Sequence, residues 1–225
     1  MIQCSHLYFS YTGGPPYLLK DLNFSVPEGD YISIVGENGC GKSTLLRLLL
    51  GFLTPVKGSL SCTARCIGYV PQRNDFANTA FPITVEEVLR SYARLLHLSS
   101  SSDIDQNLSL FGMSNMRHTL IGNLSGGQHQ KIMIIRALMG NPDLLILDEP
   151  STGVDVMSQQ DIYQSIYELN RKNKITVIAV EHNMDAAMRC SSLIYHMDQG
   201  RGHLCSPEKY ADEFLHTLRK EPHHV

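Results

Sequence analysis

One glycine-rich octapeptide constrains the fold of this chain more than any other stretch of its sequence. Residues 36–43 read Gly-Glu-Asn-Gly-Cys-Gly-Lys-Ser, which fits the phosphate-binding loop pattern G-x-x-x-x-G-K-[ST]. A compact apolar run at 31–35 precedes the loop and a helical pattern at 45–50 follows it, as a strand–loop–helix context requires. A chance match in a chain of this length is on the order of one in a hundred. We favour a phosphate-binding loop over an ordinary glycine-rich turn capped by Ser43.

The chemistry of this loop comes from its backbone and from its last two residues. Glycines let successive backbone N–H groups turn inward around phosphate oxygens, and the helix dipole adds positive potential there. Lys42 would neutralise the β- and γ-phosphates of a nucleotide, and the Ser43 hydroxyl would bind magnesium.

The composition is that of a folded protein. Of 225 residues, 43% are hydrophobic and 18% are charged, which supplies a sizeable core. Nineteen Lys and Arg against 22 Asp and Glu give a formal charge of −3, unlike the basic surface of a nucleic-acid-binding protein. No apolar stretch reaches the roughly 18 residues that cross a bilayer, and the N-terminus lacks a signal-peptide pattern. We expect a soluble, cytoplasmic chain that binds no nucleic acid.

Short apolar runs alternate with helical patterns along most of the chain. Strands are predicted at 2–9, 22–26, 31–35, 67–70, 144–147, 175–180 and 193–197, and such runs separated by helices are typical of a parallel sheet covered on both faces. The stretch from about 74 to 138 has helical periodicity instead and reads as a helical insertion. The tail after Pro207 is predicted to be helical to about Arg219. The six cysteines are interpreted as free thiols, with a metal site at Cys62 and Cys66 as a minor alternative.

Two acidic residues end the apolar run at 144–147. Asp148 and Glu149 would lie at the carboxyl end of a buried strand, where open α/β sheets bind ligands. Asp148 is suited to hold magnesium, and Glu149 to orient and deprotonate an attacking water. Capping of the following helix is the alternative. Next to a phosphate-binding loop, the catalytic interpretation is favoured.

The pentapeptide Leu-Ser-Gly-Gly-Gln at 124–128 identifies the family. Ser125 and Gln128 form a capping box, so a helix should begin here. The two glycines need another reason, because each glycine within a helix costs about 1 kcal/mol relative to alanine. Close approach of backbone N–H groups to a ligand supplies one. At this point the chain resembles the ATP-binding-cassette (ABC) ATPases, whose signature reads LSGGQ, and the resemblance covers nearly the whole chain.

The resemblance implies an α/β fold: a P-loop NTPase core with a mainly parallel sheet, an N-terminal antiparallel β region and an inserted α-helical subdomain. A single domain would span 1–225, with the core at 1–73 and 139–225 and the helical subdomain, which carries the signature, at 74–138. ATP and Mg²⁺ are the implied cofactors. The implied ATP-binding residues are Tyr11, Gly36, Glu37, Asn38, Gly39, Cys40, Gly41, Lys42, Ser43 and Thr44.

Other site residues follow from the order of the motifs. Gln72, in Val-Pro-Gln-Arg, matches the glutamine that contacts magnesium and signals to the membrane partner. Asp155 matches the D-loop aspartate, and His182 the switch histidine that contacts the γ-phosphate. Tyr11 would stack on adenine, with Tyr8, Phe9 and Tyr17 as alternatives. The implied sets are Lys42, Gln72, Glu149 and His182 for catalysis, Ser43, Gln72 and Asp148 for magnesium, and Ser125, Gly126, Gly127 and Gln128 for contact with ATP bound to a partner cassette.

The family resemblance also implies partners. Two cassettes close head to tail, so a chain with one phosphate loop and one signature must pair; we expect a homodimer, with a heterodimer still open. A membrane permease would dock at about 73–96, placing the chain at the cytoplasmic face of the membrane, with an extracytoplasmic substrate-binding protein outside.

The substrate prediction rests on weaker resemblance. Phe-Pro-Ile-Thr-Val-Glu-Glu-Val at 81–88 is similar to the matching stretch in zinc, manganese and iron-chelate importers. We expect import of a transition metal, zinc or manganese, with iron chelates or another small solute as alternatives and a soluble iron–sulfur assembly cassette as a rival. His216, His223 and His224 suggest a metal-sensing tail, although a solvated polar tail is favoured.

Overall fold

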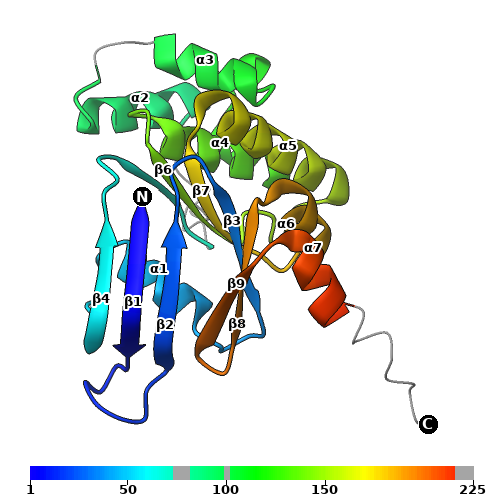
Figure 1. The fold of residues 1–225 in the computed structure, drawn as a ribbon. Helices are drawn as coiled ribbons and strands as arrows, with labels where there is room; N and C mark the ends of the chain where they lie inside the picture. The colour runs from blue at the N-terminus through cyan, green and yellow to red at the C-terminus, as the bar shows by residue number, and fades with distance from the viewer. Residues whose placement is uncertain (73–81, 99–101, 216–225) are drawn as a thin grey trace. The chain divides into compact units, whose positions relative to one another are not determined.

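The computed structural model describes residues 1–72, 82–98 and 102–215 (Figure 1). The chain forms two compact units: unit 1 comprises Met1–Thr63 and Ile178–Val225, and unit 2 comprises Ala64–Val177.

Unit 1 begins with a three-stranded antiparallel sheet. Strands β1 (Ile2–Phe9), β2 (Leu19–Val26) and β4 (Lys57–Cys62) are hydrogen-bonded in the order β2-β1-β4 (Figure 1). In β1, Ile2, Cys4, Leu7 and Phe9 are buried, as expected for a sheet with one face on the core. This sheet is the antiparallel β region that the resemblance implies. Sequence reasoning missed β4, because Lys-Gly-Ser-Leu-Ser-Cys carries one branched apolar side chain.

Unit 1 also holds the strand that leads into the glycine-rich loop. β3 (Tyr31–Gly36) pairs in parallel with β8 (Leu193–Asp198), which pairs antiparallel with β9 (Arg201–Cys205). Every β3 residue before Gly36 is buried, as the continuous apolar run predicts. The helices of this unit are α1 (Lys42–Leu49), α6 (Met184–Cys190), α7 (Pro207–Tyr210) and the π-helix η4 (Ala211–Leu215).

A small apolar cluster holds α7 against the strands and α6 of unit 1. Val35 of β3, Ile194 of β8 and Cys205 of β9 pack with Ala187 of α6 and Tyr210 of α7. The predicted C-terminal helix is therefore present as far as η4. The rest of that prediction, with His216, His223 and His224, falls outside the described residues.

Unit 2 combines a parallel strand pair with helices. β5 (Ile67–Val70) pairs in parallel with β6 (Leu144–Asp148), and β6 is buried throughout. The helical elements are α2 (Val85–Leu95), α3 (Ser102–Leu110), η2 (Ser114–Met116), η3 (Ile121–Asn123), α4 (Gly126–Leu138) and α5 (Val156–Asn173). β7 (Thr176–Val180), also fully buried, contains the boundary between the units.

The predicted helical insertion is helical wherever the structure describes it. In 82–98 and 102–138, α2 and α3 both pack on α4, and β pairing in these ranges is confined to an isolated bridge between Thr84 and Leu120. Residues 74–81 and 99–101 of the predicted insertion lie outside the described residues, as do 73–81 of the predicted permease surface.

Candidate functional site

The glycine-rich loop in unit 1 holds its lysine against its own backbone. Lys42 begins α1 and is only 6% exposed. Its Nζ donates hydrogen bonds to the carbonyl oxygens of Gly36 at 2.7 Å and Glu37 at 2.9 Å. A cation is therefore held over the loop that carries the backbone N–H groups, which is the arrangement that phosphate binding needs.

Steric limits explain two of the loop glycines. Gly36 has φ +150°, and a Cβ there would lie 2.2 Å from the Met197 carbonyl oxygen of β8. Gly41 has φ +108° and is the N-cap of α1, so this helix begins at a residue without a side chain that could accept a hydrogen bond from it. Between them Cys40 is buried, and its burial raises the pKa of the thiol.

Tyr11 is tied to the first turn of α1. Its hydroxyl lies 3.2 Å from the Thr44 Oγ1 and accepts a hydrogen bond from Arg47 Nη1 at 3.4 Å. Tyr11 is 61% exposed, and its ring packs edge-to-face on Phe9, with centroids 5.0 Å apart. Phe9 itself is buried. An exposed aromatic face beside the loop is what adenine stacking requires.

The alternative tyrosines are engaged elsewhere in unit 1. Tyr8 and Tyr17 pack edge-to-face on each other, with centroids 5.3 Å apart, and Lys57 Nζ lies within 6.0 Å of both rings. These contacts favour Tyr11 among the four candidates.

His182 also belongs to unit 1. It is exposed and lies in the short link between β7 and α6. The link is fixed on both sides, because Glu181 N–H donates to the Ile34 carbonyl at 3.0 Å and Asn183 caps α6 through Ala186 N–H at 3.1 Å. Glu181, which immediately precedes His182, is buried.

In unit 2, the Ser125–Gln128 capping box predicted from the sequence is present. Ser125 Oγ accepts from Gln128 N–H at 3.2 Å, and the Gln128 side-chain oxygen accepts from Ser125 N–H at 2.9 Å. α4 begins at Gly126, so the helix start is confirmed.

The two signature glycines meet different surroundings. A Cβ at Gly127 would lie 2.5 Å from both the Cβ and the Oγ of Ser158 in α5, whereas a Cβ at Gly126 would meet only the Gly153 carbonyl oxygen, at 3.4 Å. Packing against Ser158 therefore explains why residue 127 is a glycine. The close approach of a ligand, which is the reason predicted from the sequence for both signature glycines, is not needed for Gly127. Gly126 is exposed and stays available for a ligand.

The acidic pair ends β6. Asp148 is buried, at 7% exposure, and Glu149 is half-buried with φ +52°, a left-handed conformation that non-glycine residues rarely adopt. The chain reverses here, because Thr152 N–H donates to the Glu149 carbonyl at 3.2 Å. The Thr152 hydroxyl also donates to Glu149 Oε2 at 3.0 Å. Sequence reasoning missed Thr152, although a threonine three residues after the acid in a proline-containing turn was a usable signal.

Asp155 ends the same turn as the N-cap of α5. Its side chain accepts from Ser158 N–H at 3.0 Å, and this hydrogen bond lowers the pKa of the Asp155 carboxyl. The signature glycines and the D-loop are thus neighbours within unit 2, through Gly126–Gly153 and Gly127–Ser158. Gln72 is exposed just after β5, next to residues outside the described ranges.

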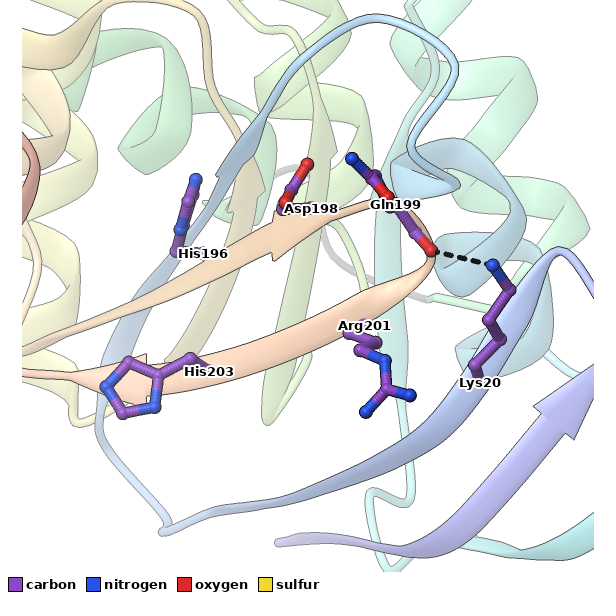
Figure 2. Close-up of a pocket in the computed structure, with 6 residues that line it drawn as sticks. All are labelled: Lys20, His196, Asp198, Gln199, Arg201 and His203. Atoms are coloured by element: carbon purple, nitrogen blue, oxygen red, sulfur yellow. Dashed lines mark hydrogen bonds between the residues drawn. The ribbon is translucent and has the colours of Figure 1, made fainter.

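Sequence reasoning did not foresee a cavity of about 500 Å³ on the β8–β9 hairpin of unit 1 (Figure 2). In the register of the hairpin His196 pairs with His203 and Asp198 pairs with Arg201, while Lys20 Nζ donates to the Gln199 carbonyl at 3.2 Å. Burial lowers the pKa of His196, an effect opposed by the charge of Asp198. The neighbouring Met197 lies against Gly36, so this hairpin packs directly on the first residue of the glycine-rich loop.

Comparison with known families agrees with these motifs. Residues 19–152, more than half of the chain, match the family described as "ABC transporter". The chain belongs to the ABC transporter family and is one of its ATP-hydrolysing cassettes. None of the helices in the described part of the chain is long and apolar enough to span a bilayer.

Several curated relatives are metal transport proteins. The chain is 45% identical to a "Probable metal transport system ATP-binding protein" of Treponema pallidum, over 95% of this chain and 89% of the relative. It is 38% identical to the "Zinc uptake system ATP-binding protein ZurA" of Listeria monocytogenes, over 79% and 75% of the two chains. It is also 32% identical to the "High-affinity zinc uptake system ATP-binding protein ZnuC" of Bacillus subtilis, over 96% and 99%.

Solved structures with the same fold include an ABC transporter and an ABC transporter cassette. A putative metal-chelate type ABC transporter in an inward-facing conformation has a TM-score of 0.84 at 26% identity, covering 98% of this chain and 89% of that one. A dimeric bacterial ABC transporter cassette has a TM-score of 0.74 at 25% identity, covering 92% and 99%. The predicted α/β cassette fold is therefore confirmed.

Proposed function

We propose that this chain is the ATP-hydrolysing subunit of an importer for a transition metal ion, with zinc or manganese as the transported substrate. The observation that carries the substrate class is the 45% identity, over 95% of this chain, to a metal transport ATP-binding protein. Two further relatives, at 38% and 32% identity, are named as zinc uptake proteins. Zinc is therefore the first substrate to test, and manganese the second.

We assign nucleotide binding in unit 1 to Tyr11 and to the loop that ends at Lys42 and Ser43. Three features support this assignment: the uncapped start of α1 at Gly41, the lysine held over the loop, and the exposed tyrosine ring beside Thr44. The adenine would stack on Tyr11, and the phosphate oxygens would accept hydrogen bonds from the backbone N–H groups of the loop. The remaining members of the assigned set are Gly36, Glu37, Asn38, Gly39, Cys40, Gly41 and Thr44.

Magnesium fits the donor chemistry of these residues. Mg²⁺ prefers oxygen ligands and is held in nucleotide sites by one or two side chains together with phosphates. Ser43 offers an exposed hydroxyl in the first turn of α1, Asp148 offers a carboxylate at the end of β6, and Gln72 offers an amide oxygen. Bound there, the ion would neutralise charge that develops on the transferred phosphoryl group.

The reaction assigned to the site is hydrolysis of the terminal phosphoanhydride. Glu149 accepts a proton from water as the water oxygen bonds to the γ-phosphorus, and the bond from that phosphorus to the bridging oxygen breaks to leave ADP. Lys42 and His182 are assigned to the charge on the γ-phosphate, and Gln72 to positioning and to signalling toward the permease. These roles rest on side-chain chemistry and on the order of the motifs.

The partners follow from the cassette assignment. A second copy would supply Ser125, Gly126, Gly127 and Gln128 to the ATP bound by the first, with Asp155 at the junction between copies. The exposure of Ser125 and Gly126 supports this role. A membrane permease would hold the dimer at the cytoplasmic face of the membrane, and an extracytoplasmic substrate-binding protein would deliver the metal.

The metal content of whole cells tests the substrate assignment. A strain lacking the gene would be complemented with the wild type or with Glu149→Gln, and zinc, manganese and iron would be measured by mass spectrometry. We expect a selective fall in zinc or manganese that only the wild type restores. Unchanged zinc and manganese would contradict the metal assignment and leave the ATPase assignment intact.

A metal chelate is the second candidate substrate, because the solved metal-chelate transporter has the same fold at 26% identity. A selective fall in iron in the same experiment would favour it. Co-purification with soluble partners in place of a membrane protein would favour the alternative function, that of an iron–sulfur assembly cassette.

A further inference from the structure

The turn that follows β6 is fixed by a series of hydrogen bonds. Thr152 N–H donates to the Glu149 carbonyl at 3.2 Å and Val154 N–H donates to the Ser151 carbonyl at 3.2 Å. Asp155 then caps α5. The segment from the acid to the helix is thus a run of two turns and a cap.

α5 holds this turn from the other side. The Gln159 amide donates to the carbonyls of Val154 at 2.7 Å and Ser151 at 3.3 Å, and the Tyr163 hydroxyl donates to Ser151 Oγ at 2.8 Å. Tyr163 is 3% exposed, so it anchors the turn in the core of unit 2. A turn held at both ends fixes where its side chains lie.

Within this turn we propose that Thr152 is a positioning residue for ATP hydrolysis, whose hydroxyl fixes the Glu149 carboxylate in the orientation that accepts the proton of the attacking water. The hydroxyl donates to Glu149 Oε2 at 3.0 Å. This hydrogen bond ties one carboxylate oxygen, Oε2, to the turn and so restricts the orientation of the whole group. This inference rests on the proposed role of Glu149.

Backbone and side chain act together at this position. Glu149 has φ +52°, a left-handed conformation that is strained for a non-glycine residue and persists where the surroundings determine it. The reversal brings the carboxylate back over residue 152. The hydrogen bond from the threonine hydroxyl then favours the side-chain rotamer that places Oε2 beside residue 152.

The test replaces only the hydroxyl. Thr152→Val keeps the shape of the side chain, and Thr152→Ser keeps the donor. We expect Thr152→Val to lower kcat about tenfold, with KM for ATP within about twofold of the wild type, because one oriented hydrogen bond is worth about that factor. Thr152→Ser should restore kcat to within about threefold of the wild type. Ser165→Ala, which removes a hydroxyl bonded to the Asp161 carbonyl on α5, is the matched control and should leave kcat unchanged.

Two outcomes overturn the inference. One is wild-type kcat in a folded Thr152→Val chain; the other is equal loss in the Val and Ser variants, which would indicate a packing role. Glu149→Gln separates this failure from that of the proposed function. If Glu149→Gln hydrolyses ATP like the wild type, the base assignment is wrong; if it is inactive while Thr152→Val is fully active, only the positioning role is wrong. In the Glu149→Gln background, Thr152→Val should cause no further loss of kcat.

Discussion

Two glycine-rich segments of this chain each begin a helix, and they do so in opposite ways. The phosphate loop of unit 1 enters α1 through Gly41, with φ +108° and no side chain at the N-cap. The signature of unit 2 enters α4 through Ser125, in a capping box that Gln128 completes. The start of α1 thus has no side-chain cap, whereas the start of α4 is closed by a capping box.

The difference separates two kinds of anion contact. An uncapped helix start with an adjacent lysine can surround a phosphate by itself. A helix whose Ser125 and Gln128 N–H groups already have acceptors offers a small exposed surface around Gly126. This contrast is what a shared site requires, in which the loop of one copy binds the nucleotide and the signature of another copy completes it.

The largest expected effect is at the open helix start. Lys42→Ala removes the cation held on the Gly36 and Glu37 carbonyls, and we expect nucleotide affinity or turnover to fall about a hundredfold. Titration with a fluorescent ATP analogue and a phosphate-release assay measure the two quantities. Lys172→Ala, which removes a surface charge paired with Glu168, is the matched control. Equal behaviour of the two variants would remove Lys42 from the site.

At the capped start of α4, a substitution should abolish ATP hydrolysis without changing ATP binding. Ser125→Arg should abolish hydrolysis while the affinity of the monomer for ATP stays within about twofold, because the signature acts on a nucleotide bound elsewhere. The variant also loses a helix cap, worth about 1 kcal/mol. Thr84→Ala removes the equivalent cap from α2 and controls for that loss. Weakened ATP binding by the Ser125→Arg monomer would contradict the assignment of the signature to a nucleotide bound by another copy.

Within the signature, the two glycines should differ in stability. Gly127→Ala places a Cβ 2.5 Å from Ser158, and we expect the free energy of unfolding to fall by about 1–3 kcal/mol. Gly126→Ala should change it by less than about 1 kcal/mol. Urea unfolding of both variants measures the difference, and Ser158→Gly in the Gly127→Ala background should recover part of the loss. Similar values for the two single variants would contradict the packing explanation.

The smallest expected effect is a pH dependence of the free energy of unfolding, caused by His129 in α4, the helix that begins at the signature. Burial, together with the charge of Arg136, lowers the pKa of His129 in α4. Below about pH 6.5 the unfolded chain takes up a proton that folded His129 resists, so this group reduces stability as the pH falls. His129→Gln should therefore show a smaller decrease in unfolding free energy between about pH 7.5 and pH 5.5. An unchanged decrease would contradict the lowered pKa of folded His129, and a larger decrease would indicate a raised pKa instead.

Local chemistry was readable from the sequence where one segment decides it. The strand before the phosphate loop, the capping box at Ser125 and the buried strand ending at Asp148 each depend on a few neighbouring residues, and all three are present. The order of motifs then gave the family. Tyr11 could be separated from Tyr8 and Tyr17 only by contacts, because all three lie within ten residues.

What the sequence could not give depends on residues distant along the chain. The fit of Gly127 depends on Ser158, thirty-one positions later. β4 has little strand-type sequence and is recruited by pairing with β1, so tertiary context overrides weak propensity. The cavity on the β8–β9 hairpin needs Lys20 to lie beside residues 196–203. Such contacts arise only from the folded topology.

Light scattering of Glu149→Gln with and without ATP tests the shared site most directly. Without hydrolysis the closed pair should persist, so we predict a doubling of mass when ATP and Mg²⁺ are added, and no doubling in Glu149→Gln combined with Ser125→Arg, which still binds ATP. A chain that remains a monomer with ATP bound, or a double variant that still doubles in mass, would contradict the account.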